Sequence, residues 1–352
     1  MRYISGLQFQ LKKLFFKIKR AIFHLFRLTN DPVVKVYHGY GNDEKIVLFG
    51  HVLSISPIPR KKFRSNFWTN AFALLRSFML VPIPNARVRV HWDGQIFEDK
   101  TAHDGFFRIE CNCAITVPPG LHKVKVEYYE PGIDLPLIIA EGLGWVVIPH
   151  ISQLAFISDI DDTFLISYSS SFFRKLYVLL SKNAHSRKPF DGVVRHYNLL
   201  AKAQMKDGAN SFFYVSSSEW NLYDFIKEFC RKNNLPEGVY LLSTAKRFSQ
   251  LWNTGGNNHS TKFMRIARII ESFPLQKFVL LGDDSQMDPE IYASIAEYFP
   301  EKIKAVYLRN VFDKNHLKVT ESIERLKKAG VNVCHFEHSK NAIEHSQNIG
   351  LI

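Results

Sequence analysis

Short apolar runs that alternate with helical segments dominate the second half of this 352-residue chain and constrain its fold most strongly. From about residue 151 onward, each run has the length of one buried strand and is followed by a stretch of helical periodicity. Nearly continuous apolar strands are typical of a parallel sheet that helices cover on both faces. We therefore expect an α/β, Rossmann-like domain. Its expected strands are 154–158, 212–216, 239–242, 278–281, 305–308 and 331–336, and its expected helices lie near 190–205, 219–232, 261–272, 288–298 and 319–329.

The pattern before residue 151 is that of β-structure. Val88, Val90 and Trp92 alternate along one side of a run, and Asp93-Gly94 and Asp104-Gly105 are turn signals. Short strands separated by such turns predict a small β-sandwich. The expected organisation is a basic amphipathic helix at 1–30, a β-sandwich domain at 31–150, the α/β domain at 151–340 and a tail at 341–352.

Composition narrows the class of protein. Hydrophobic residues make up 46% of the chain and charged residues 22%, which argues against intrinsic disorder. Without a long, charge-free apolar stretch, a multi-span membrane protein is also excluded. Four cysteines are too few for a disulfide scaffold, so we expect buried or half-buried thiols.

The N-terminal segment carries much of the formal net charge of +13. Residues 1–30 contain basic residues and no acidic ones, and their apolar residues recur at helical spacing. Lysines interrupt the apolar stretch, which argues against a signal peptide and favours a cytoplasmic location. We expect residues 1–29 to lie on an anionic membrane surface as an interfacial helix, so that the protein is peripherally membrane-associated. A helix that packs on the protein itself, with solvated lysines, is the alternative.

The first apolar run of the α/β half leads directly into the sequence Asp159-Ile160-Asp161-Asp162-Thr163. Residues two apart in extended backbone point to one side, so Asp159 and Asp161 present their carboxylates together. Phosphoryl transfer uses such a pair, with one carboxylate as nucleophile and the other as general acid and base. A metal ion must offset the charge between carboxylate and phosphate, and oxygen ligands favour Mg²⁺. An acidic turn that caps a helix is the alternative interpretation.

Three later segments strengthen the case for phosphoryl transfer. The hydroxyls of Ser216–Ser218 follow a strand and precede a helix, where they could bind phosphate or cap the helix. Lys262 opens a helix against the favourable direction of the helix dipole, so it is either a phosphate partner or a solvated lysine. Gly282–Asp284 and Asp288 form a second acidic cluster suited to Mg²⁺. Because parallel strands bind ligands at their carboxyl ends, we expect these residues to meet at one edge of the sheet.

Three longer stretches resemble a known family. They run from Phe156 to Thr163, from Tyr214 to Asp224 and from Lys277 to Tyr292. The first carries the D-x-D-x-T motif and resembles the haloacid dehalogenase superfamily of aspartate-nucleophile phosphatases. The other two are more specific, and they resemble the phosphatidate phosphatase family typified by the yeast actin-patch protein, whose catalytic segment is similar to the C-terminal domain of lipins. The resemblance covers the chain from about residue 37 to about residue 336.

The resemblance implies a role for each matching residue. Asp159 would be the nucleophile and a Mg²⁺ ligand, and Asp161 would be the general acid and base, with its backbone carbonyl on the metal. The other implied residues are Thr163, which orients the site and contacts phosphate, the phosphate-binding Ser216, Ser217 and Lys262, and the metal-binding Asp283, with Asp284 or Asp288 in support. One departure is that Thr261 precedes Lys262, where the family often has His. The short segment 164–189 stands in place of a large cap domain, which implies an open site.

The function that we expect from the sequence is a Mg²⁺-dependent phosphatase that converts phosphatidate to diacylglycerol at a membrane surface. A phosphatase of soluble sugar or protein phosphates is the alternative enzyme. A catalytically silent, membrane-bound scaffold is the alternative of another class, although the intact acidic motifs argue against it. Binding of nucleic acid is disfavoured because the positive charge concentrates on an apolar-striped helix. The sequence leaves the oligomeric state open.

Overall fold

The computed structural model describes most of the chain. The described residues are 28–29, 31–57, 79–113, 116–133, 135–150, 154–161, 163, 189–205, 208–243, 258–311 and 316–352. The predicted interfacial helix at 1–30, apart from residues 28–29, lies outside them, as does most of the short segment at 164–189. Asp162 also lies outside them.

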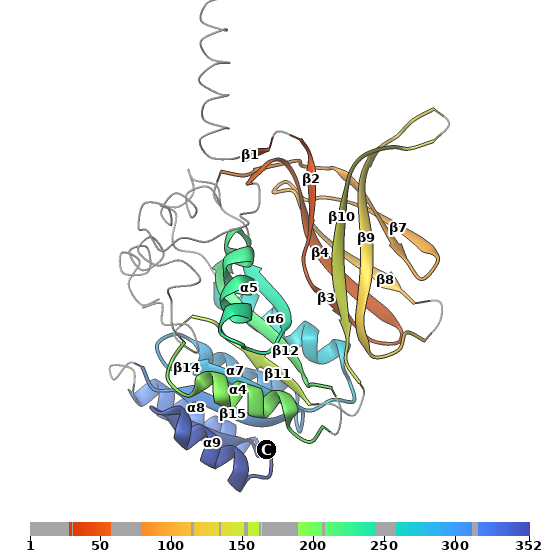
Figure 1. Ribbon diagram of the computed structural model, residues 1–352. Coiled ribbons are helices and arrows are strands. Elements are labelled where there is room, and N and C mark those ends of the chain that lie inside the picture. Colours follow the sequence, from red (N-terminus) through yellow and green to blue (C-terminus); the bar gives the residue numbers. More distant parts are fainter. Residues whose placement is uncertain are drawn as a thin grey trace, which may run out of the picture.

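The C-terminal half is built on a six-stranded, wholly parallel sheet in the order β13-β12-β11-β14-β15-β16 (Figure 1). Every residue of β11 and of β14 is buried, as their unbroken apolar sequences require. The α/β parallel sheet that the sequence predicts is therefore confirmed. The strands are β11 (Ala155–Ser158), β12 (Ser211–Glu219), β13 (Gly238–Ser243), β14 (Phe278–Asp283), β15 (Ile303–Arg309) and β16 (Asn332–Phe336).

Two groups of helices accompany this sheet. Helix α4 packs against α9, and helices α6, α7 and α8 pack in sequence order. The strand order reverses between β11 and β14, and such a reversal opens a crevice at the carboxyl ends of the strands. The helices are α4 (Val193–Lys202), the short 3-10 helix η1 (Trp220–Leu222), α5 (Tyr223–Lys232), α6 (Asn258–Ser272), α7 (Asp288–Tyr298), α8 (His316–Lys328) and α9 (Ser339–Asn348).

The C-terminal segment differs from the sequence-based expectation. A tail is expected at 341–352, whereas most of this segment belongs to helix α9, with Ala342 and Leu351 fully buried. Its apolar stripe is short, so hydrophobic periodicity gives little warning of it. Hydrogen bonds help to hold α9 on the domain. The Ser346 hydroxyl lies 3.0 Å from His196 Nε2 and 2.6 Å from the Tyr307 hydroxyl.

The N-terminal half is a ten-stranded β-structure in which the strand pairs are antiparallel, except for β3 with β10. Asp93 and Gly94 both have positive φ, which matches the tight turn between β6 and β7. One hydrophobic cluster joins inward side chains of β4 and β8 to those of β6, β9 and β10. The sandwich itself stays a prediction, as do the domain boundaries. The strands are β1 (Leu28–Thr29), β2 (Val33–Val36), β3 (Gly39–Gly41), β4 (Lys45–Pro57), β5 (Val81–Pro82), β6 (Arg87–Trp92), β7 (Gln95–Lys100), β8 (Phe106–Asn112), β9 (Gly120–Glu130) and β10 (Leu137–Ile148).

The two halves share a hydrophobic core. Tyr37, Tyr40, Val47 and Phe49 of the β half belong to the same buried cluster as the strands of the parallel sheet. Tyr40 packs edge-on against Phe213 of β12, with ring centroids 5.7 Å apart. The β half is therefore fastened to the sheet by aromatic packing.

The cysteines are free thiols. Cys111, Cys230 and Cys334 are buried and Cys113 is half-buried, as the sequence analysis expects. Burial raises the pKa of Cys111 and of Cys230 to about 12, which makes these thiols unreactive.

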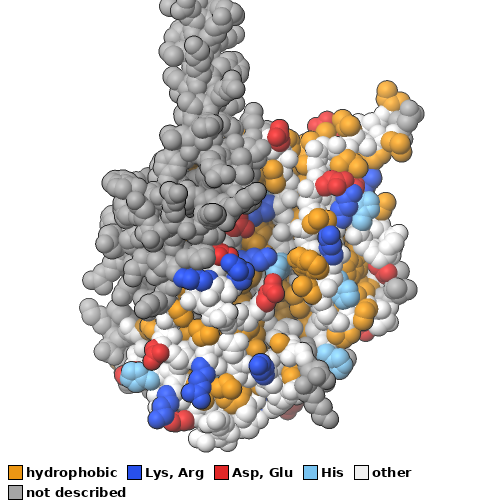
Figure 2. All heavy atoms as spheres, viewed as in Figure 1, with side chains coloured by type: hydrophobic (Ala, Val, Ile, Leu, Met, Phe, Trp, Pro, Cys, Tyr) orange, Lys and Arg blue, Asp and Glu red, His pale blue; other side chains and the backbone are white. Residues whose placement is uncertain are grey.

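The surface of the β half carries exposed hydrophobic side chains. They gather at the projecting end of the β9–β10 hairpin (Figure 2), where Ile133 and Leu135 are almost fully exposed. Among the described helices, none combines the length and the apolar character that crossing a membrane requires.

Candidate active site

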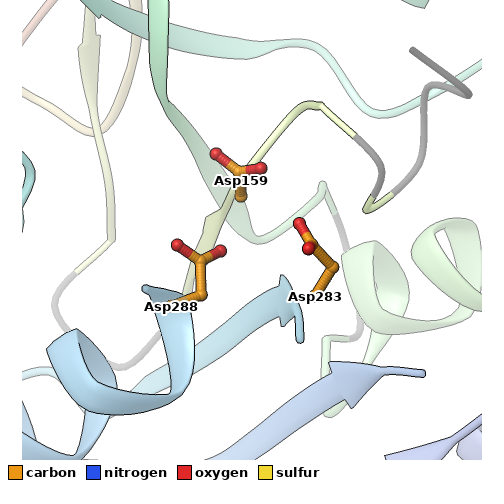
Figure 3. A group of neighbouring side chains, drawn as sticks. All are labelled: Asp159, Asp283 and Asp288. Atoms are coloured by element: carbon orange, nitrogen blue, oxygen red, sulfur yellow. The ribbon is translucent and has the colours of Figure 1, made fainter. Parts of the chain in front are cut away.

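Three aspartates converge at the carboxyl edge of the parallel sheet. Asp159 follows β11, Asp283 ends β14 and Asp288 begins α7. Their carboxyl groups face one another across a common space (Figure 3), with one oxygen of each within 4.8 Å of the others. All three are buried, with exposed fractions of 2% or less. The sequence places two of these residues 124 positions or more from the first, and the parallel topology brings them together.

Lys262 supplies a positive charge to this cluster. Its ammonium lies 2.7 Å from Asp159 Oδ1 and also donates to Asp288 Oδ1, and the side chain is buried. Burial alone would lower the pKa of Lys262, but the carboxylates of Asp159 and Asp288 raise it above its ordinary value. Lys262 is therefore a permanent cation that bridges two of the three aspartates.

The three aspartates of the cluster outnumber the single positive charge of Lys262. Burial, followed in effect by the neighbouring carboxylate of Asp288, raises the pKa of Asp283 to about 7. Burial also raises the pKa of Asp159 well above its usual range, against the opposing effect of Lys262. Three carboxylates and one ammonium form a donor set that suits a hard divalent cation, because carboxylate oxygens are the ligands such ions prefer. The three aspartates could hold a metal ion.

Thr163 ties the loop after β11 to this cluster. Its hydroxyl donates to Asp283 Oδ2 at 3.3 Å and, more weakly, to Asp159 Oδ2 at 3.5 Å. The carbonyl of Thr163 accepts a hydrogen bond of 3.0 Å from Arg309 Nε. Arg309 is itself buried, with its guanidinium over the rings of Phe190 and Phe336. This arginine therefore fixes the end of the acidic loop.

Asp161 points to the C-terminal end of β12 and does not belong to the group of three. Ser218 Oγ donates to Asp161 Oδ2 at 2.7 Å, and Ser216 Oγ lies 3.4 Å from the same oxygen. Ser217 is half-buried. The expected pair Asp159 and Asp161 thus has its two carboxyl groups in different surroundings, one beside Lys262 and the other beside hydroxyls.

Asp284 and Asp288 have different environments, although both were expected near the metal. Asp284 Oδ2 lies 3.0 Å from His335 Nε2, and its Oδ1 accepts from the backbone N–H of Val311 at 2.8 Å. Asp288 faces Asp159 and Asp283. Of the two candidates for support of the metal, the geometry favours Asp288.

Several residues at the site were not anticipated from the sequence. Ser285 donates to Asp283 Oδ1 through its backbone N–H at 2.7 Å and also through its hydroxyl. Tyr292, one helical turn after Asp288, lies with its hydroxyl 3.4 Å from Asp288 Oδ2 and donates to the Leu281 carbonyl at 2.9 Å. The spacing of Ser285 after Asp283 is a local turn signal that could have indicated it. Arg309 depends on tertiary packing, and no local pattern points to it.

Gly282 leaves room for this arrangement. A Cβ atom at position 282 would come within 2.5 Å of Asp288 Oδ2 and within 2.8 Å of the Tyr292 ring. Only glycine allows α7 to approach the end of β14 so closely. The glycine of the Gly-Asp-Asp motif is therefore part of the geometry that gathers the carboxylates.

The buried, lysine-bridged acidic cluster lies at the carboxyl edge of the parallel sheet, where α/β folds of this kind bind their ligands. Residues 154–310 match the family model described as "Phosphatidate phosphatase APP1, catalytic domain". The matched residues contain the whole acidic cluster.

Two curated relatives match part of the chain. The phosphatidate phosphatase APP1 of Saccharomyces cerevisiae is 32% identical over 162 residues, which are 44% of this chain and 26% of the yeast protein. An uncharacterized protein of Schizosaccharomyces pombe is 32% identical over 101 residues, which are 28% of this chain and 16% of that protein. The match thus spans about a quarter or less of the length of these relatives.

A solved structure also aligns with the chain. It is a carbohydrate acetylesterase from Xanthomonas citri, with 11% sequence identity and a TM-score of 0.30, over 91% of this chain and 75% of that one. A TM-score this low carries no argument about fold or function.

Proposed function

We propose that this protein is a metal-dependent phosphatase that removes phosphate from phosphatidate through an aspartyl-phosphate intermediate. The observation that carries the proposal is the buried cluster of Asp159, Asp283 and Asp288, bridged by Lys262, in a segment that matches the phosphatidate phosphatase family model. The resemblance of this segment to the haloacid dehalogenase superfamily supports the same chemistry.

In the first half of the reaction, Asp159 is the nucleophile. An oxygen of its carboxylate attacks phosphorus, the bond between phosphorus and the diacylglycerol oxygen breaks, and Asp161 gives a proton to the departing alkoxide. Burial raises the pKa of Asp159, and the short contact with Lys262 acts against this effect and favours the ionised nucleophile. In this proposal, Lys262, Ser216, Ser217 and Thr163 bind the oxygens of the transferred phosphoryl group.

In the second half, Asp161 takes the role of general base. It accepts a proton from water, the water oxygen attacks phosphorus, and the bond to Asp159 breaks to release inorganic phosphate. The hydrogen bonds from Ser218 and Ser216 hold Asp161 beside the same site through both halves. The proton taken from water replaces the one given to the alkoxide, so the enzyme returns to its starting state.

Asp159, Asp283 and Asp288 are the residues that would hold the metal ion, with Mg²⁺ as the ion that their oxygens favour. When bound, the ion supplies charge neutralisation between the carboxylates and the phosphate dianion. The raised pKa values of Asp159 and Asp283 support this assignment, because they reflect buried negative charge that Lys262 alone does not balance.

We further propose that the protein works at a membrane surface. The basic, apolar-striped residues 1–29 are the proposed anionic-membrane contact, and peripheral association on the cytoplasmic side is the location that follows. Vesicle binding before and after deletion of residues 1–29 tests this part separately from catalysis. Retained binding after the deletion would contradict it.

The central test is phosphate release from phosphatidate in mixed micelles, with Mg²⁺ and with EDTA. We expect metal-dependent release by the wild type and a loss of about 10³-fold or more for Asp159→Asn, since removal of a nucleophile has effects of that order. Turnover of an aryl phosphate without release from phosphatidate would refute the lipid substrate and retain the mechanism. Inactivity on both substrates would refute the enzyme function altogether and favour a binding scaffold.

A further inference from the structure

The C-terminal end of β12 holds the carboxyl group of Asp161 through a defined set of contacts. Ser218 Oγ donates to Asp161 Oδ2 at 2.7 Å, and the backbone N–H of Ser218 donates to Ser216 Oγ at 2.9 Å. The register of β12 against β13 shifts between Val215 and Glu219, so the serines lie in an irregular stretch of the strand. Ladder hydrogen bonds alone therefore do not determine where Ser218 points.

Trp220, which follows β12, is held in place by aromatic side chains of the β half. Trp220 is buried and stacks on Tyr37, with ring centroids 4.2 Å apart and an interplanar angle of 17°. Phe49 of β4 and Phe106 of β8 approach the same indole, at centroid distances of 6.3 Å and 5.8 Å. Three aromatic rings of the β half thus surround a side chain that lies two residues from Ser218.

Polar contacts fix the start of α5 in the same way. The Tyr223 hydroxyl accepts a hydrogen bond of 3.2 Å from the backbone N–H of His38. Lys35 Nζ lies 2.8 Å from Asp224 Oδ2. The β half therefore also holds the chain that follows Trp220. The end of β12 that carries Ser218 thus has little freedom to shift away from Asp161.

We propose that Ser218 is a positioning residue for the acid/base carboxylate of Asp161, and that Tyr37 of the β half positions Ser218 by its stack on Trp220. This inference rests on the proposed role of Asp161 in catalysis. It assigns a task in the reaction to a half of the molecule that contributes no residue to the acidic cluster.

The proposed role of Ser218 predicts a difference between alkyl and aryl phosphate esters. When the phosphorus–oxygen bond breaks, an alkoxide such as that of diacylglycerol needs a proton from Asp161, whereas a p-nitrophenolate leaves without one. Loss of the correct orientation of Asp161 should therefore slow cleavage of the alkyl ester far more than cleavage of the aryl ester. A general loss of structure would slow both.

The experiment compares kcat/KM, which reports the steps up to cleavage of the ester, for dioctanoyl phosphatidate and for p-nitrophenyl phosphate. General acid catalysis contributes about 10²-fold to 10⁴-fold, so we expect Ser218→Ala to lower kcat/KM for phosphatidate about tenfold and for the aryl ester less than about twofold. Ser218→Thr keeps a hydroxyl and should restore most of the loss. Asp161→Asn is the reference and should show the same substrate selectivity with a larger loss.

Tyr37 and Tyr40 form a matched pair for the contribution of the β half. Both are 2% exposed and both pack against the parallel-sheet half, but Tyr40 contacts Phe213 and Phe273 instead of Trp220. We expect Tyr37→Leu to show the same substrate-selective loss as Ser218→Ala, and Tyr40→Leu to leave the ratio of the two kcat/KM values unchanged. Thermal unfolding of each variant monitors folding. Tyr37→Phe keeps the stack and loses the hydrogen bond between the Tyr37 hydroxyl and His51 Nδ1, so it should keep the wild-type ratio of the two kcat/KM values.

Two results would overturn the inference. Equal losses on both substrates for Ser218→Ala, or equal selectivity of Tyr37→Leu and Tyr40→Leu, would show that these residues have only a structural role. A failure of the proposed function has a different signature. In that case Asp161→Asn itself shows no difference between the two substrates, or the wild type hydrolyses neither.

Discussion

The two halves of the molecule bury charge in different ways. In the parallel-sheet half, Asp159, Asp283 and Asp288 share a single buried lysine. In the β half, the buried Glu127 has both His91 Nε2 and Lys125 Nζ within 2.9 Å, and although burial raises its pKa, these contacts bring it below the usual value. Unbalanced buried charge is costly to folding, and it persists where a ligand or a reaction needs it. The comparison separates the half that contains the candidate active site from the half that does not.

The largest expected effect comes from removal of the bridging cation. Lys262→Met should lower kcat by about 10³-fold, because a preorganised charge at the transferred phosphoryl group is lost. It should also destabilise the metal-free protein by about 3 kcal/mol, since it leaves buried carboxylates without their partner. Phosphate release and urea unfolding in EDTA measure the two effects.

Lys125→Met in the β half is the matched control. It removes a partly exposed lysine from two glutamates, so we expect unchanged activity and a much smaller loss of stability than for Lys262→Met. Equal destabilisation by the two substitutions would remove the contrast between the halves.

The next prediction compares the contributions of two adjacent residues, Asp283 and Asp284, to metal binding. Asp283→Asn should weaken Mg²⁺ binding at least about tenfold, an effect of the size that substitutions around metal sites have. Without metal, the same substitution should raise the thermal unfolding temperature, because it removes a buried charge beside Asp288. Asp284→Asn, whose carboxyl group faces His335, should leave Mg²⁺ affinity unchanged. Calorimetric titration with Mg²⁺ measures the affinity of each variant. Weaker binding by Asp284→Asn alone would contradict the assigned site.

The smallest effect concerns acid stability, which we compare at the buried His51 of the β half and the buried His196 of the parallel-sheet half. Burial lowers the pKa of His51 to about 4 and that of His196 to about 3. Below pH 6.5 the unfolded chain binds these protons and the folded chain does not, so stability falls as the pH drops from 6.5 toward 4. Each histidine should contribute about 2 kcal/mol to the loss between pH 7 and pH 5.

Urea midpoints at these two pH values measure the loss. His51→Gln and His196→Gln should each reduce the difference between the midpoints, whatever their effect at pH 7. If only one of them does so, the two halves differ in acid sensitivity, and the equal contributions that we expect are wrong.

Much of the parallel-sheet half could be predicted from the sequence. Its strands are buried on both faces, so apolar runs such as 278–281 mark them directly, and the acidic residues follow at the strand ends. The convergence of Asp159, Asp283 and Asp288 then depends only on parallel topology. Their roles in catalysis stay predictions.

Other features could not be predicted, because they depend on contacts between distant segments. Helix α9 has too short an apolar stripe to be recognised, and it is fixed by Ser346 and Ala342. The difference between Asp284 and Asp288 follows from the start of α7 and from His335, which lies 51 residues away from Asp284. Neither relation leaves a periodic signal in the chain.

The stack of Trp220 on Tyr37 has an optical consequence. An indole enclosed by aromatic rings and shielded from water emits at shorter wavelength than an exposed one, and its emission responds to small displacements of its neighbours. The chain has five tryptophans, so the difference spectrum between wild type and Trp220→Phe would isolate this one. The contact between the two halves thus provides an intrinsic fluorophore that can follow their coupling during turnover without any added label.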